Sequence, residues 1–248
     1  MASGRDAEVF VLDDKRVLRR CRNGEYRCEG QAALMEWARA QGFPVPRVFS
    51  ACGPEMVLER VDGPTMVEAM SAGSLDPVTI GRLLADLLRA LHALPVPARP
   101  VPLRRGSTSC TRIDLARSVT PATSRTNLIL AGPAGWPDGH RLRHLDLHPE
   151  NVLMSSQGPM VIDWSNADHG PAGVDTALSA LILAQIAILP GPFQDPVRPM
   201  ICALLNGCDP FSDQDVDAAV AMRAVNPTMT EAEIAALGRA SELIRPAG

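Results

Sequence analysis

The chain has 248 residues, of which 46% are hydrophobic, which is enough apolar material for one large domain or two packed lobes. Its formal net charge of −4 lacks the basic surplus that is typical of a nucleic-acid-binding protein. The longest apolar stretch, residues 177–189, is too short to span a bilayer and contains Gln185. We therefore expect a buried helix there, and neither a nucleic acid nor a membrane as a partner.

The cysteines favour a reduced environment. The six cysteines form no CxxC pair, and their spacing fits neither a zinc site nor a dense disulfide framework. The first residues, Met-Ala-Ser-Gly-Arg-Asp, lack the apolar core of a signal peptide. We expect buried thiols in a cytoplasmic protein.

The first sixty residues predict a small lobe that mixes strands with a helix. Residues 8–12 and 16–20 flank Asp13-Asp14-Lys15 in a pattern that is typical of a β-hairpin. Residues 30–41 have helical periodicity, and residues 55–61 predict another strand. Because Asp62-Gly63-Pro64 interrupts this strand, we expect an N-terminal lobe at residues 1–62 and a C-terminal lobe at residues 63–248.

The remainder predicts mainly helices. Pro77 suits the first position of a helix with a leucine stripe, and Ser212 and Thr230 begin capping boxes of two later helices. Residues 95–140 are rich in Pro, Gly, Ser and Thr, and we predict only a strand at 127–131 within them.

The residues that indicate chemistry lie close together in the sequence. Residues 144–153 are His-Leu-Asp-Leu-His-Pro-Glu-Asn-Val-Leu, and Asp163 follows within Val-Ile-Asp-Trp. Two apolar segments separated by a turn at Gly158 predict a hairpin that brings Asn151 and Asp163 to one edge. Phosphoryl transfer needs a carboxylate to orient the attacking hydroxyl, and a further carboxylate and an amide oxygen to hold a metal on the phosphates. Such hard oxygen ligands suit magnesium.

This motif resembles that of the aminoglycoside phosphotransferase and choline kinase group of small-molecule kinases. The second His and the Pro of the loop, and Ile-Asp-Trp in place of Asp-Phe-Gly, are closer to that group than to protein kinases. Further matches lie at residues 43–48, 58–65 and 170–175, so the resemblance covers most of the chain except roughly residues 95–140. It implies an α+β, protein-kinase-like fold of two lobes, with a small antiparallel sheet in the N-terminal lobe and a mostly helical C-terminal lobe.

The resemblance also implies roles for individual residues. Asp146 matches the catalytic aspartate, and Asn151 and Asp163 match the ligands of Mg²⁺. The backbone from Glu59 to Val61 matches the hinge that binds the adenine of ATP, or the base of GTP. Asp175 matches an aspartate that supports the catalytic loop.

The acceptor implied is a small molecule with a hydroxyl group. The acidic residues between positions 146 and 175 would attract metal and positively charged substrates, which agrees with an amine-bearing acceptor.

Three features depart from this family pattern. Arg19 stands where the phosphate-binding lysine is expected, and the alternative is that Arg19 is a surface residue of its strand. The first kinase strand and its glycine-rich loop should precede Glu8, and we expect them to be largely absent. The helix carboxylate that would pair with the phosphate-binding cation falls near Gln31, and we favour Glu29 for that role.

These departures leave a second hypothesis open. A degenerate kinase fold would bind a nucleotide or a partner without turnover, and the shortened glycine loop and Arg19 favour it. The complete set of Asp146, Asn151 and Asp163 argues against it.

Two other interpretations fit less well. A protein kinase needs an activation segment after Asp163, and the helical pattern from Ala177 follows too soon. A zinc site at His144 and His148 is disfavoured because Pro149 interrupts the helix that such a site uses.

Overall fold

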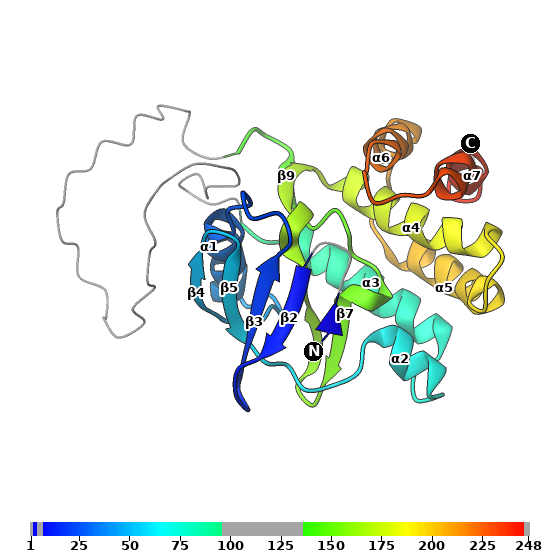
Figure 1. The fold of residues 1–248 in the computed structure, drawn as a ribbon. Helices are drawn as coiled ribbons and strands as arrows, with labels where there is room; N and C mark the ends of the chain where they lie inside the picture. Colours follow the sequence, from blue (N-terminus) through cyan, green and yellow to red (C-terminus); the bar gives the residue numbers. More distant parts are fainter. Residues whose placement is uncertain (1, 4–6, 96–135, 246–248) are drawn as a thin grey trace.

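The structure is a computed structural model that describes residues 2–3, 7–95 and 136–245. Its N-terminal part is an antiparallel sheet with one helix against it (Figure 1). The strand predicted at 127–131 lies outside the described residues. The strand order is β1-β2-β3-β5-β4. The strands are β1 (Ala2–Ser3), β2 (Ala7–Val11), β3 (Arg16–Cys21), β4 (Val48–Cys52) and β5 (Glu55–Glu59).

The predicted hairpin is formed by β2 and β3. Asp13 fixes its turn, because its carboxylate accepts hydrogen bonds from the Lys15 amide at 2.9 Å and from Arg16 Nε at 2.7 Å. Within the described residues β1 spans Ala2–Ser3, which pair with Val9 and Glu8 of β2. Helix α1 (Glu29–Ala40) buries Leu34, Met35 and Ala38 in the core beside β4.

Strand β4 was not predicted from the sequence. It has only two consecutive strong strand formers, Val48 and Phe49, before Ser50 and Ala51, and its register with β5 is irregular between Val48 and Ser50. Pairing with β5 therefore outweighs local preference here.

The C-terminal part is mostly helical and is built around α4 (Figure 1). Helix α4 (Ala172–Ile188) is buried on nearly every side, which confirms the buried helix predicted at 177–189, and α5, α6 and α7 contact it. The other helices are α2 (Met66–Ser71), α3 (Pro77–His92), α5 (Gln194–Gly207), α6 (Asp213–Ala224) and α7 (Glu231–Glu242). No helix in the described part of the chain is both long and apolar enough to cross a membrane.

The predicted helix starts are confirmed. Asp76 caps α3 by accepting the Thr79 amide at 3.0 Å, and complete capping boxes begin α6 at Ser212 and α7 at Thr230. Helix α5 was not predicted, because it begins after a Pro- and Gly-rich stretch and contains Pro199.

Two strand pairs position the loops that carry the motif. Strand β6 (His140–Arg143) pairs with β9 (Asp168–Pro171), and β7 (Val152–Ser155) pairs with β8 (Gly158–Val161).

The chain leaving β5 passes directly over β7. The Met154 amide donates to the Pro64 carbonyl at 2.7 Å, and a Cβ on Gly63, whose φ is 149°, would lie 2.1 Å from the Met154 carbonyl oxygen. The end of β5 is thereby held next to the β7–β8 hairpin.

Candidate active site

The loop of residues 144–148 is held in a conformation that its own sequence does not favour. Leu145 has φ 61°, a left-handed value that costs a non-glycine residue about 1–3 kcal/mol. Asp175, fully buried at the start of α4, compensates by accepting the amides of Leu145 at 2.7 Å and His144 at 2.9 Å. Asp175 therefore has the loop-supporting contacts that the sequence predicted.

His92 completes the contacts of the Asp175 carboxylate. Its Nε2 lies 3.0 Å from Asp175 Oδ2, and both side chains are buried. Burial acts to raise the pKa of Asp175, but the hydrogen bond and charge of His92 and the loop amides outweigh it, so the pKa lies below the usual 3.8. Asp175 is thus a buried carboxylate anion.

His144 connects this loop to the segment before Asp163. Its Nε2 donates to the Ile162 carbonyl at 3.0 Å, and its ring meets Trp164 edge-on at 5.0 Å between centroids. His144 is fully buried, and burial lowers its pKa below the usual 6.5 despite the nearby Asp175, so the ring is neutral. His144 is therefore a buried, hydrogen-bonded residue that supports the loop.

The buried neutral state of His144 predicts a pH dependence of stability. Above pH 6.5 this ring is neutral in both the folded and the unfolded chain, so it has no effect. As the pH falls below 6.5, the unfolded chain takes up a proton that the folded chain resists, so stability falls until the lowered folded pKa is reached. His144→Gln keeps a donor for Ile162 and should reduce this loss by up to about 1.4 kcal/mol per pH unit. Urea unfolding at pH 7 and pH 5 measures it, and equal losses in the two proteins would contradict it.

The predicted hairpin places Asn151 and Asp163 at one edge. Asn151 ends a short 3-10 helix (Pro149–Asn151), and its carbonyl accepts the Ile162 amide at 2.9 Å, immediately before Asp163. The Asn151 Nδ2 donates to the Asp146 carbonyl at 2.9 Å and lies 3.3 Å from Asp146 Oδ2. Asn151 therefore joins the loop of Asp146 to the turn of Asp163.

Asp163 has a left-handed φ of 57°, and its Oδ1 accepts two hydrogen bonds. Arg19 Nη2 donates at 2.8 Å and Ser165 Oγ at 2.9 Å. Within the described residues, Oδ2 of Asp163 accepts no hydrogen bond. Ser165 was not singled out from the sequence, although it stands only two residues after Asp163.

Arg19 reaches this site from strand β3 of the other lobe. It is only 7% exposed, so the alternative that Arg19 is a surface residue is wrong. The expectation for Glu29 is also wrong, because its Oε1 accepts the Gly53 amide at 2.8 Å. Gln31, buried on α1, lies 3.4 Å from the Tyr26 hydroxyl. The carboxylate that Arg19 contacts is Asp163.

Two backbone hydrogen bonds fix the direction of the chain at the end of β5. The Glu59 amide donates to the Arg47 carbonyl at 2.8 Å, and the Arg60 amide donates to the Lys15 carbonyl at 2.8 Å. Because the N–H and C=O groups of one strand residue point to the same edge, the Glu59 carbonyl also faces the β4 side. Strand β4 begins at Val48, so the Glu59 carbonyl lies beside the first residue of β4.

The donor atoms at this edge fit a magnesium ion. No group of three or more His, Cys, Asp or Glu side chains in the described part of the chain is arranged to hold a metal. Magnesium in proteins commonly uses one or two protein oxygens and completes its shell with water and phosphate oxygens. Asp163 Oδ2 and the side-chain oxygen of Asn151, whose Nδ2 faces Asp146, are oxygens of this kind and could hold such an ion.

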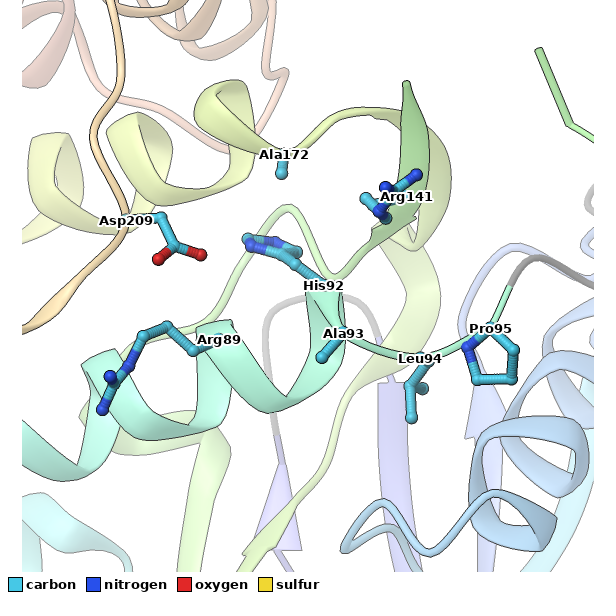
Figure 2. A pocket seen from close by; sticks show the side chains of 8 residues that line it. All are labelled: Arg89, His92, Ala93, Leu94, Pro95, Arg141, Ala172 and Asp209. Atoms are coloured by element: carbon cyan, nitrogen blue, oxygen red, sulfur yellow. The ribbon is translucent and has the colours of Figure 1, made fainter. Parts of the chain in front are cut away.

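A separate cavity of about 470 Å³ lies at the ends of α3, β6 and α4 (Figure 2). His92 lines it and links it to Asp175, but Asp146, Asn151 and Asp163 do not line it. The guanidinium groups of Arg89 and Arg141 point in different directions in Figure 2 and do not converge on a common point.

Residues 1–207 of the chain match a family model that is described as the phosphotransferase enzyme family. No protein with a curated description matches the chain.

Several solved structures share the fold. A choline/ethanolamine kinase family protein from Mesorhizobium loti has a TM-score of 0.53 and 14% identity, covering 98% of this chain and 87% of its own. The gentamicin complex of APH(2")-IIa has a TM-score of 0.52 and 12% identity, covering 90% of this chain and 79% of its own. The ADP-bound aminoglycoside phosphotransferase APH(2'')-Ib has a TM-score of 0.50 and 12% identity, covering 99% of this chain and 93% of its own. At these identities the similarity establishes a kinase-like fold.

Proposed function

This chain belongs to the phosphotransferase enzyme family, and we propose that it transfers the γ-phosphate of Mg²⁺-bound ATP or GTP to a hydroxyl group of a small molecule. Two bonded pairs carry this proposal. Arg19 donates to Asp163 at 2.8 Å from one lobe to the other, and within the C-terminal lobe Asn151 Nδ2 donates to the Asp146 carbonyl at 2.9 Å and lies 3.3 Å from Asp146 Oδ2. The pairs are adjacent because the Asn151 carbonyl accepts the amide of Ile162, the residue before Asp163, at 2.9 Å. These lobes correspond to residues 1–62 and 63–248.

Each residue has one task in this proposal. Asp146, part-exposed beside Asn151, orients the acceptor hydroxyl and takes its proton as its oxygen bonds to the γ-phosphorus. The bond from that phosphorus to the β–γ bridging oxygen breaks, and the nucleoside diphosphate leaves with that oxygen. Asn151 and Asp163 hold the metal, which when bound neutralises charge on the phosphates. The Arg19 guanidinium binds phosphate oxygens, a task that suits its planar set of donors.

The hinge backbone holds the nucleotide base in this proposal. The Glu59 carbonyl, which faces the β4 edge beside Val48, accepts from the base, and the Val61 amide two residues further on donates to it. The base then lies between the lobes, with the phosphates directed towards Arg19 and Asp163.

The acceptor class follows from charge. The solved relatives include a gentamicin complex, and this chain has an exposed Glu150 beside Asn151 and Asp168 on β9. Carboxylates near the site favour an acceptor that carries amino groups as well as a hydroxyl.

A degenerate kinase is the second candidate function, and Arg19 in place of the expected lysine is the observation that favours it. Arginine can bind phosphate, but it is larger than lysine and not equivalent to it at this position. Such a protein would bind nucleotide without transferring phosphate.

Nucleotide binding and turnover separate the two candidates. Mg-ATP or Mg-GTP at a hundredfold excess over its dissociation constant should stabilise the protein by roughly 2.7 kcal/mol. Nucleotide consumption should then rise in the presence of an amino alcohol or aminoglycoside from a panel of acceptors. Stabilisation without consumption by any acceptor would favour the degenerate kinase, and no stabilisation by either nucleotide would contradict both candidates.

A further inference from the structure

Arg19 and Asp163 form an ion pair in which no carboxylate of helix α1 takes part. Arg19 Nη2 lies 2.8 Å from Asp163 Oδ1, with the Arg19 side chain 8% and the Asp163 side chain 37% exposed. In the family pattern a carboxylate of the helix in the N-terminal lobe pairs with the phosphate-binding cation. Here Glu29 of α1 instead binds the Gly53 amide. Asp163 therefore serves both as the partner of Arg19 and as a proposed metal ligand.

We propose that Arg19 is a built-in counter-cation that keeps divalent metal off Asp163 until a nucleotide arrives. This inference rests on the proposed function of the same site. Without nucleotide, the guanidinium neutralises the carboxylate. With nucleotide, the triphosphate takes over the guanidinium, and Asp163 becomes a full anionic ligand for the metal.

Electrostatics favours this exchange. A guanidinium and a carboxylate in contact have no net charge together, so a divalent ion arriving alone meets little attraction and a close positive charge. Arg19 cannot relieve this repulsion by losing its proton, because a guanidinium stays protonated in proteins. Since Arg19 is nearly buried, solvent screens the repulsion weakly.

A bound polyphosphate competes with Asp163 for the Arg19 guanidinium. Its oxygens offer the guanidinium a multidentate partner with more charge than one carboxylate, so moving Arg19 from Asp163 to phosphate leaves no buried charge unpaired. The binding of metal and the binding of nucleotide are then coupled, and the Arg19 side chain is the group that couples them.

Arg19→Met tests this coupling, because methionine keeps an unbranched side chain and removes the charge. Mn²⁺ binding to the nucleotide-free protein, measured by electron paramagnetic resonance, should become tighter by about tenfold or more. Binding of a non-hydrolysable ATP analogue with Mn²⁺ should become weaker by about tenfold. These opposite changes distinguish the proposed role from general loss of structure, which would weaken both.

Arg20→Met is the matched control. Arg20 is the next residue of β3 and pairs with Glu55 at 2.8 Å, with the two side chains 49% and 45% exposed. The substitution makes the same change in net charge on the same strand but on its exposed face. Both affinities should stay within about twofold of the wild type.

Arg19→Gln provides a second variant if Arg19→Met does not fold, because glutamine can still donate to Asp163 without a charge. Unchanged or weaker binding of free Mn²⁺ in a folded Arg19 variant would overturn the inference while leaving the proposed function intact. Tighter Mn²⁺ binding in the variant, in a protein that binds no nucleotide, would support the ion-pair inference and refute the proposed function.

Discussion

Asp146→Asn should lower kcat for phosphoryl transfer by about a thousandfold while leaving nucleotide affinity and stability close to those of the wild type. Asparagine has the shape of aspartate, and its side-chain oxygen can still accept from the Asn151 amide nitrogen, which lies 3.3 Å from Asp146 Oδ2. It cannot accept the proton of the acceptor hydroxyl. The expected loss therefore falls on the chemical step, which steady-state kinetics with a saturating acceptor measures.

Glu150→Gln is the matched control for this prediction. Glu150 is exposed in the same loop and loses the same charge on substitution, so it reports on the general attraction of cations to the site. Its kcat should stay within about threefold of the wild type. If Asp146→Asn retained a similar rate, Asp146 would not be the base.

Local sequence patterns predicted the elements whose ends are fixed by nearby side chains. The β2–β3 hairpin depends on Asp13 and its neighbours, and α3 depends on Asp76 and Pro77. Strand β4 and helix α5 depend instead on their partners, since β4 has only two consecutive strong strand formers, Val48 and Phe49, and α5 contains Pro199. Local preference could not reveal either of them.

The candidate site also combines contacts between residues close in the sequence with contacts between distant residues. Asp146, Asn151 and Asp163 lie in one loop and hairpin, so their spacing predicted that they meet. The partner of Arg19 could not be predicted, because Arg19 and Asp163 are 144 residues apart and meet only when the lobes are packed. The resemblance indicated a helix carboxylate for Arg19, and the contact of Glu29 with the Gly53 amide is set by the position of α1 beside β4.

Asp175→Asn should destabilise the protein by about 3–5 kcal/mol, the cost of breaking a buried charged network from one side. The Asp175 carboxylate is fully buried and uses both oxygens to accept from the His144 amide, the Leu145 amide and His92. Asparagine replaces one of these oxygens with a donor, which then faces the donors of the loop or of His92. At least one buried donor loses its partner whichever way the amide is turned.

The same substitution should also remove activity, although Asp175 contacts no reacting group. The left-handed Leu145, at φ 61°, is held by the hydrogen bond from its amide to Asp175, and Asp146 is the next residue. Without that bond Leu145 can relax, and the direction of the Asp146 side chain changes with it. Asp217→Asn, which weakens an exposed ion pair with Arg245, is the control and should cost less than about 1 kcal/mol. Urea unfolding and kcat should separate the two variants, and equal stability losses would contradict a special role for the buried carboxylate.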